Sequence, residues 1–162
     1  MRNAHIVSVR RAQATDFHSV QQLILEMDAF HHANAPERIK PAAAALLRQD
    51  DFAGFLADDT QLVSVAVKER EVVGFIRAKL QDAPEGRAHW ARRSVSIHEV
   101  VMHPGTRRLG IGKKLMAEVC DWATRQRAAS VELNVYAFNT EALQFYRSLG
   151  FSNLTFRLAK AL

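Results

Sequence analysis

Residues 94–112, SVSIHEVVMHPGTRRLGIG, decide how the chain is organised. Apolar, β-branched residues predict a strand, Pro104 and Gly105 a turn, and the run RRLGIG leads into a helix. A strand that ends in a Gly-rich turn before a helix directs free backbone N–H groups, and the positive end of the helix dipole, toward one point. We therefore predict an anion site, above all for phosphate, where Gly110 and Gly112 let the backbone approach a pyrophosphate.

Two common phosphate-binding loops do not fit these residues. A Walker A loop requires Ser or Thr after Gly-Lys, and here Lys114 follows Gly112 and Lys113. A dinucleotide fingerprint requires a third glycine three residues after Gly112, where this chain has Leu115. We therefore predict a phosphate-binding loop of another type.

Composition indicates a single domain over residues 1–162 without a membrane span or secretory signal. The net charge of +5 suits a polyanionic partner, but it does not choose between a nucleotide, a nucleic acid and an acidic surface. Cys120 is the one cysteine, so an internal disulfide is excluded and no zinc pattern is present. We therefore expect a cytoplasmic protein with no metal site.

Hydrophobic periodicity predicts a mixed α/β domain in the order β-α-α-β-β-β-α-β-α-β. The predicted strands are residues 6–10, 61–68, 72–80, 94–102, 131–138 and 151–158, and the predicted helices are residues 17–30, 41–56, 109–127 and 140–149. Thr15 or Asp16 is expected to cap the first helix, which frays at residues 31–34, and Asn139 or Thr140 to cap the last. Gly74 predicts a bulge or a close approach, Gly150 a left-handed helix end, and residues 81–93 a loop.

The loop and the order of elements resemble the GCN5-related N-acetyltransferase (GNAT) superfamily over essentially the full length. Arg107, Gly110 and Gly112 occupy the fixed positions of that family's acyl-CoA signature, Arg/Gln-x-x-Gly-x-Gly/Ala after a core strand. A second match, NTEALQFYRSLGF at residues 139–151, is similar to the segment after the family's fifth strand. The resemblance implies a central mixed sheet, flanked by helices, with its fourth and fifth strands splayed apart.

Acetyl-CoA is the co-substrate that this resemblance implies. It places the pantetheine arm and acetyl group on the backbone of the central strand, the pyrophosphate on the loop amides, and a further contact after the fifth strand. The implied residues are Val100, Val101 and Met102 on the strand, Arg108, Leu109, Gly110, Ile111 and Gly112 in the loop, and Asn139. Side chains of Arg107 and Arg108 would contact phosphates, although solvated loop cations are the plainer interpretation of these two. Lys113 and Lys114, in the first turn of the helix, are expected to help neutralise the nucleotide. The strand residues fit a buried strand equally well.

The chemistry requires a neutral amine and a protonated or less basic thiolate leaving group. The resemblance implies that Tyr146 donates a proton or hydrogen bond to the departing sulfur; the alternative is a helix tyrosine packed in the core. For the base we favour Glu99 over His98, with a bound water as a third possibility. Alternation along the strand is expected to put these two side chains on opposite faces. The alternative for Glu99 is an ion pair with a loop arginine such as Arg92 or Arg93.

The resemblance implies direct transfer of an acetyl group from acetyl-CoA to a primary amine of a small molecule, a polyamine-like compound, or a protein or peptide. A non-catalytic acyl-CoA-binding regulatory module on the same fold is the alternative. Nucleic-acid binding through the basic loop around Trp90 is disfavoured because no nucleic-acid module is present. His31 and His32 lie near the expected acceptor entrance, and adjacent residues chelate a metal poorly. Homodimers are common in proteins of this type.

Overall fold

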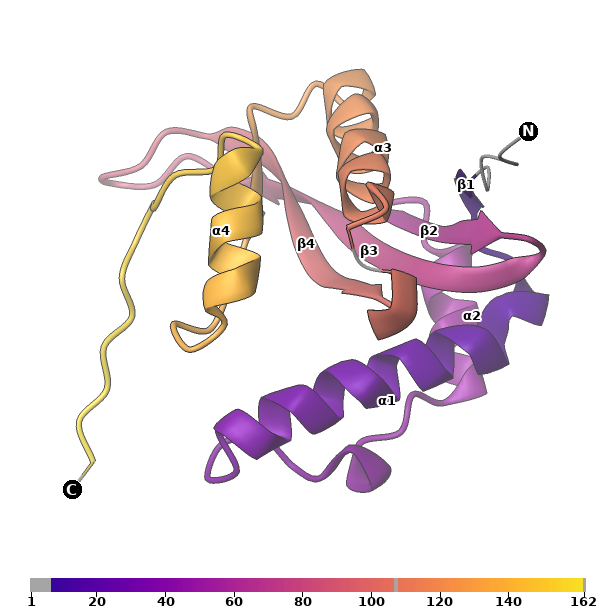
Figure 1. The fold of residues 1–162 in the computed structure, drawn as a ribbon. Helices are drawn as coiled ribbons and strands as arrows, with labels where there is room; N and C mark the ends of the chain where they lie inside the picture. The colour runs from indigo at the N-terminus through magenta and orange to yellow at the C-terminus, as the bar shows by residue number, and fades with distance from the viewer. Residues whose placement is uncertain (1–6, 107, 162) are drawn as a thin grey trace.

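The computed structural model describes residues 7–106 and 108–161, which contain a five-stranded mixed sheet (Figure 1). The strand order is β1-β2-β3-β4-β5, in which the first three pairs are antiparallel and β4 and β5 are parallel. The bounds are Val7–Arg11 for β1, Gln61–Lys68 for β2, Glu71–Ala83 for β3, Arg92–Met102 for β4 and Ser130–Leu133 for β5. The predicted mixed α/β class is confirmed.

Helices cover both faces of the sheet. On one face lie α1 (Phe17–Asn34) and α2 (Gln49–Ala57), and on the other lies α3 (Ile111–Arg125), as Figure 1 shows. The last helix, α4 (Thr140–Ser148), stands beside β4. Short 3-10 turns occupy Ala14–Asp16, Ala42–Ala44 and Pro104–Thr106. Within the described residues, no helix has the length and apolar character that crossing a bilayer requires.

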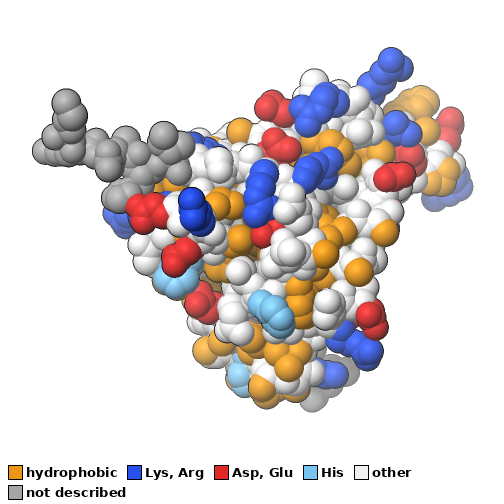
Figure 2. All heavy atoms as spheres, turned by 90° about the vertical axis from the view of Figure 1, so that its right-hand side faces the viewer, with side chains coloured by type: hydrophobic (Ala, Val, Ile, Leu, Met, Phe, Trp, Pro, Cys, Tyr) orange, Lys and Arg blue, Asp and Glu red, His pale blue; other side chains and the backbone are white. Residues whose placement is uncertain are grey.

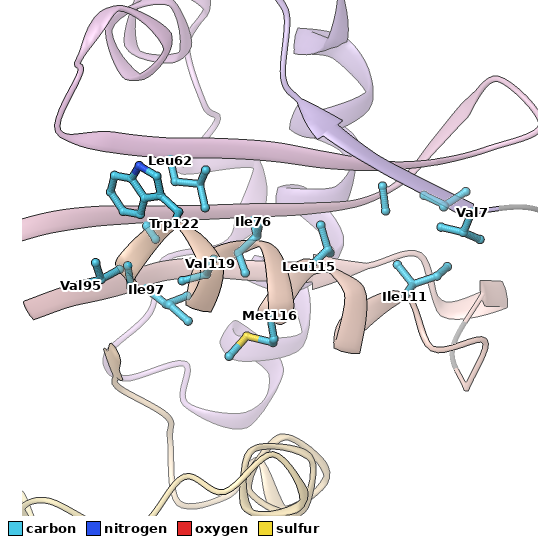
Figure 3. Packing of buried hydrophobic residues seen from close by; sticks show 14 residues of the cluster. Val7, Leu62, Ile76, Val95, Ile97, Ile111, Leu115, Met116, Val119 and Trp122 are labelled. Carbon is cyan, nitrogen blue, oxygen red and sulfur yellow. The ribbon is translucent and has the colours of Figure 1, made fainter. Parts of the chain in front are cut away.

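The apolar side of α3 packs on the sheet (Figure 3). This packing fixes the direction of the loop that precedes the helix. Its buried residues recur at the spacing of one helix face: Ile111, Leu115, Met116, Val119 and Trp122. They pack on inward residues of β2, β3 and β4 such as Leu62, Ile76 and Val95. A separate buried cluster joins α1 and α2 to the other face through Phe17, Phe52 and Phe75.

Gly74 has both properties that the sequence predicts for it. The β2–β3 register slips beside it, because Ala66 pairs with Gly74 and Val67 with Val72, which leaves Val73 as an extra residue. A Cβ on Gly74 would also lie 3.1 Å from Leu115 Cδ1. The glycine therefore lets α3 lie close to the sheet.

Several predicted bounds differ from the structure. The β3–β4 hairpin continues to Ala83 and Arg92, so the loop is shorter than residues 81–93, because Asp82 pairs with Arg93 across the strands at 2.7 Å. Helix α1 continues to Asn34 without fraying at His31. The strand β5 ends at Leu133, well before residue 138.

The predicted strand at residues 151–158 is absent from the structure. These residues carry the alternating pattern of a strand, but they lie along no partner edge and run away from the sheet as an extended tail (Figure 1). Leu154, Phe156 and Leu158 are 68%, 81% and 91% exposed. A strand needs a neighbour to satisfy its backbone, which the pattern alone does not supply.

The predicted helix ends are partly right. Asn139 caps α4 by accepting a hydrogen bond from Ala142 N at 3.2 Å, and Gly150 is left-handed with φ of 89°. Asp16 precedes α1, but its carboxylate does not cap that helix. It accepts two hydrogen bonds from Arg10, at 2.7 and 2.8 Å, and one from Gln13 N at 2.8 Å. A guanidinium is a stronger partner for a buried carboxylate than a single amide.

Candidate active site

The turn between β4 and α3 presents its backbone to open space. Thr106 closes the turn, since its N–H and its hydroxyl both donate to His103 O at 2.9 Å. Arg108 and Gly110 then adopt left-handed φ of 63° and 76°, and α3 begins at Ile111. A Cβ on Gly110 would meet nothing within 4 Å, so a ligand can reach the amides of the first turn of α3, which have no partner inside the helix. This geometry fits a phosphate group.

Gly112 lies on the inner side of the helix and has a different role. A Cβ there would stand 2.9 Å from both Met102 Sδ and Phe145 Cζ. The missing side chain therefore lets α3 pack against β4 and α4, a reason that the sequence did not reveal. Its amide as a phosphate ligand stays a prediction.

The basic residues of the loop divide into two groups. Arg108 and Lys113 are exposed at the start of α3, while Arg107 lies outside the described residues. Lys114 Nζ instead donates to Val7 O at 2.7 Å and so links α3 to β1. Of the two lysines, Lys113 is therefore the one whose charge stays available to a nucleotide.

The strands β4 and β5 part after a short paired segment. Their register runs from Ser94–Ser130 to Ile97–Leu133, while β4 continues to Met102. The last five residues of β4 therefore lie beyond the described β5 pairing, and this is the separation that the sequence predicts. Val100 and Met102 pack toward α3 and Val101 toward α1, which agrees with the buried-strand interpretation of their side chains.

A β-bulge corrects the prediction that His98 and Glu99 face opposite sides of the sheet. Arg77 pairs with Glu99 and Ala78 with Ile97, so His98 is an extra residue on β4. An inserted residue resets the alternation of the strand. The His98 imidazole accordingly interacts electrostatically with Arg77 and with Glu99.

Glu99 forms a bidentate ion pair with Arg77 of β3. Arg77 Nε lies 2.6 Å from Oε2 and Nη2 lies 2.8 Å from Oε1, and the guanidinium also stacks 4.1 Å over the Phe55 ring. The predicted partners are wrong, because Arg92 pairs with Glu132 and Arg93 with Asp82. A bidentate pair of this kind compensates the partial burial of both charges.

Two more titratable groups lie near this pair. Partial burial and then the positive charge of Arg77 lower the pKa of His98, against a smaller opposing effect of Glu99. Partial burial raises the pKa of Asp28 on α1, and the nearby Glu99 raises it further, while His31 opposes this. The site thus places an imidazole inclined to be neutral beside two carboxylates.

Aromatic side chains line the space between α1 and the segment after β5. The Tyr136 and Phe138 rings stack at 5.1 Å, the His31 ring lies 5.6 Å from Tyr136, and Phe30 lies 6.0 Å from Phe138. We call Phe30, His31, Tyr136 and Phe138 the aromatic cluster. The sequence does not indicate this cluster, because the alternation of residues 136 and 138 predicts a strand. It also gives no signal for Asp28.

The two predicted histidines have different surroundings. His31 belongs to the aromatic cluster, whereas His32 Nδ1 contacts Ile39 O at 2.6 Å. In the described part of the chain, no group of three or more His, Cys, Asp or Glu residues is placed to hold a metal ion.

Tyr146 is half-buried on α4, against the rings of Phe145 and Phe151 at 5.4 and 5.8 Å. Burial raises the pKa of its hydroxyl to about 12, so it keeps its proton at every physiological pH. It packs on the edge of the α3-side core, as the alternative interpretation expects, and its chemistry is that of a hydrogen-bond or proton donor.

Comparison of the whole chain with known proteins identifies its family. The family model described as Acetyltransferase (GNAT) family matches residues 24–151. The chain belongs to this family. The Salmonella typhimurium aminoalkylphosphonate N-acetyltransferase is 29% identical over 157 residues, which cover 97% of this chain and 92% of that enzyme. The mycothiol acetyltransferase of Renibacterium salmoninarum is 32% identical over 125 residues, 75% of this chain but only 33% of that longer protein.

Solved structures agree on the fold of this acetyltransferase. A Bacillus halodurans protein superposes with a TM-score of 0.90 at 23% identity, over 96% of this chain and 99% of that one. An aminoglycoside N-acetyltransferase in complex with CoA superposes with a TM-score of 0.74 at 17% identity, over 100% and 98% of the two chains.

Proposed function

We propose that this acetyltransferase moves the acetyl group of acetyl-CoA to a primary amine by direct attack. The observation that carries the proposal is the open turn at Gly110 next to the β4 edge that β5 leaves unpaired. The aminoglycoside acetyltransferase of the same fold was solved with CoA, which supports the choice of co-substrate.

Two parts of the chain would hold acetyl-CoA, which supplies an activated thioester when bound. The amides of residues 108–112 would receive the pyrophosphate at the positive end of α3, assisted by the charges of Arg107 and Lys113. Backbone groups of Val100, Val101 and Met102 would hydrogen-bond the pantetheine arm. Asn139 would add a contact through its amide N–H, since its carbonyl oxygen already caps α4.

An amine at neutral pH is mostly protonated and must lose a proton before it attacks. The structure alters our preference for Glu99, because both of its carboxylate oxygens already accept hydrogen bonds from the Arg77 guanidinium, at 2.6 and 2.8 Å. His98 is the better acceptor, since its lowered pKa favours the neutral imidazole. We assign the proton transfer to His98, directly or through water, and the attraction of the ammonium group to Glu99.

This assignment is tested by the pH dependence of kcat/KM for His98→Gln and Glu99→Gln. The histidine variant should lose the acidic limb of the profile, where kcat/KM falls as the imidazole becomes protonated, and most of its kcat. The glutamate variant should mainly raise the KM for the amine. The opposite pattern would return the role of base to Glu99.

The acceptor that this site favours is an organic cation. The carboxylates of Asp28 and Glu99 provide negative charge, and the aromatic cluster beside them offers ring faces to a cation. The phosphonate-bearing acceptor named for the Salmonella relative would instead bring negative charge toward the same carboxylates. Small amines, polyamine-like compounds and protein or peptide amines all satisfy this charge requirement.

The experiment follows CoA thiol release with three acceptors: an aliphatic diamine, a monoamine of equal length and 2-aminoethylphosphonate. We expect the diamine to have the lowest KM. Asp28→Asn should raise that KM about tenfold with the acetyl-CoA KM unchanged, while the exposed Glu26→Gln on the same helix should change neither. A preference for the phosphonate would contradict the acceptor class.

The alternative is a regulatory module that binds acyl-CoA without turnover. The half-buried hydroxyl of Tyr146 and the neighbouring His98 and Glu99 are groups that a binder would not need, so they favour the enzyme. Tight acetyl-CoA binding without transfer to any amine would support the module.

Nucleic-acid binding is disfavoured because Arg92 and Arg93 are paired with carboxylates, and because lysines and arginines are interspersed with acidic residues on the face in Figure 2. We also propose a cytoplasmic location, with Cys120 as an unpaired thiol.

A further inference from the structure

Arg77 lies on the face of the sheet that α1 and α2 cover, next to the candidate site. Phe75 on β3 and Val101 on β4 belong to the buried cluster beneath these helices. Arg77 and Glu99 each lie two positions from one of them, and side chains two apart on a strand share a face. The register pairs Arg77 with Glu99 across the two strands. An arginine that the reaction has not used therefore stands beside its acceptor carboxylate.

The Arg77 guanidinium is held on three sides. Its Nε and Nη2 donate to the two carboxylate oxygens of Glu99, and its Nη1 donates to Gln61 Oε1 at 3.0 Å. The Phe55 ring, near the end of α2, lies 4.1 Å from its central carbon. The side chain is only 13% exposed. A planar guanidinium with three such partners keeps one orientation.

This guanidinium fixes the orientation of the Glu99 carboxylate. A bidentate pair sets the rotation of the carboxylate, whereas a single donor would leave it free to turn. Each carboxylate oxygen has two lone pairs, and Arg77 uses one on each, so one on each oxygen stays open to an ammonium group. The Glu99 side chain is 23% exposed, which leaves it accessible from one side. Glu99 is therefore oriented before the acceptor arrives.

Arg77 also places a positive charge beside His98. Partial burial is the largest cause that lowers the pKa of His98, and the charge of Arg77 is the next, while Glu99 opposes both. A nearby positive charge disfavours the imidazolium form. The same guanidinium thus acts on the two side chains to which the proton transfer and the attraction of the amine are assigned.

The other charged groups around His98 have smaller effects or are already paired. Lys79 on β3 lowers the pKa of His98 less than Arg77 does, and its Nζ lies 3.1 Å from Asp58 Oδ2. On α1, Asp28 interacts with His31 and with the carboxylate of β4. Arg77 is therefore the cation with the largest influence on this imidazole.

We propose that Arg77 is the positioning residue of this site: it orients the Glu99 carboxylate toward the acceptor amine and keeps a positive charge beside His98. Gln61 and Phe55 hold its guanidinium in place. The inference rests on the proposed acetyl transfer, in which Glu99 attracts the ammonium group and His98 takes its proton. Arg77 touches neither substrate and acts through these two side chains.

Kinetics with the diamine acceptor test this role. Arg77→Gln should raise the diamine KM at least about tenfold, because Glu99 is no longer held in one orientation. The acidic limb of its kcat/KM profile should move to higher pH, since His98 is protonated more easily without the neighbouring charge. Arg77→Lys should keep the limb near its wild-type pH and still have a raised KM, because lysine keeps the charge but not the planar fork.

Arg93→Gln is the matched control, because Arg93 forms the same kind of pair with Asp82 between the same two strands, near the hairpin loop. This variant should keep the wild-type KM and pH profile. An Arg77→Gln enzyme with wild-type KM and pH profile would overturn the inference.

The double variant Arg77→Gln, Glu99→Gln tests whether Arg77 acts through Glu99. Adding Arg77→Gln to Glu99→Gln should change the diamine KM less than about twofold, whereas two independent effects would multiply. The double variant also avoids leaving a partly buried carboxylate without its partner, and circular dichroism checks its fold. Effects on KM that multiply would overturn the positioning role.

Nuclear magnetic resonance of the His98 imidazole separates this inference from the proposed reaction. The signal of His98 is identified by its loss in His98→Gln. In Arg77→Gln, His98 should become protonated at higher pH than in the wild type, and in Arg93→Gln at the wild-type pH. An unchanged titration in Arg77→Gln would overturn the action of Arg77 on His98, whether or not the protein transfers acetyl groups. Absence of transfer by the wild type, together with the expected shift, would contradict the proposed function and still support that action.

Discussion

The two parts of this chain differ in how deeply their apolar side chains are buried. Every residue that the structure buries lies between Val7 and Ala123, and residues 124–161 contribute none, although they include apolar side chains such as Leu143, Leu149 and Phe151. The first part, β1 to α3, stabilises the fold with two packed clusters. The second part, β5, α4 and the tail, keeps apolar groups half-covered. The second part therefore contributes little to the core and leaves apolar side chains in contact with solvent.

The largest expected effect comes from removing equal side chains from the two parts. Leu115 is fully buried on α3, so Leu115→Ala should lower the free energy of unfolding by about 3 kcal/mol through lost burial and a cavity. Leu143→Ala removes the same atoms from half-exposed α4 and should cost less than about 1 kcal/mol. Urea denaturation measures both. Equal losses would mean that the C-terminal part is as tightly packed as the core.

A negative charge in the glycine turn should abolish binding of acetyl-CoA. Gly110→Asp puts a carboxylate where the pyrophosphate is expected and should weaken binding at least about 100-fold, which corresponds to about 2.7 kcal/mol. Gly150→Asp is the matched control, because Gly150 is also left-handed with open space around its Cβ position. Titration calorimetry on both variants separates charge from backbone strain. Unchanged affinity in Gly110→Asp would remove the turn from the phosphate site.

The ion pair of Asp16 and Arg10 should stabilise the first part of the chain in a pH-dependent way. Hydrogen bonding from Arg10 holds the pKa of Asp16 below its usual range, so this stabilisation is present above about pH 4 and disappears as the pH falls through the lowered pKa. Asp16→Asn should cost about 2 kcal/mol at pH 7 and progressively less in acid. Asp82→Asn, in the exposed pair with Arg93, should matter far less. A loss that does not depend on pH would contradict the ionic role of Asp16.

The smallest of these effects concerns the hydroxyl of Tyr146. Tyr146→Phe should reduce kcat about tenfold, or about 1.4 kcal/mol, and leave the affinity for CoA nearly unchanged. Because the pKa of this hydroxyl is about 12, the wild-type rate should show no loss of its donor below about pH 10. Tyr136→Phe removes the same atom from the aromatic cluster and should leave kcat intact. If Tyr146→Phe is fully active, another group protonates the sulfur.

Local sequence patterns predict the first part of the molecule well. The strand β2 has the predicted bounds, and the apolar spacing of α3 and the double role of Gly74 follow from residues next to one another in the chain. Trp122, at one end of the buried face of α3, is in the core as expected. In these elements, local preference and tertiary packing favour the same structure.

The candidate site was less predictable, because it depends on registers and on partners from distant segments. The bulge at His98 arises from a slip against β3, and no residue in β4 marks it. Glu99 pairs with Arg77, which lies 22 positions earlier on a neighbouring strand, rather than with a nearby loop arginine. In the tail the local pattern predicts a strand that the structure does not form. A strand forms only where a neighbouring strand edge supplies its backbone hydrogen bonds.

Calorimetric titration of the folded protein with acetyl-CoA tests the central claim most directly. We expect one acetyl-CoA bound per chain with micromolar affinity, and a similar value for free CoA because the turn at Gly110 binds the part that both share. No binding by a sample whose circular dichroism and urea transition show it to be folded would contradict the assignment of this turn, and with it the proposed acetyl transfer.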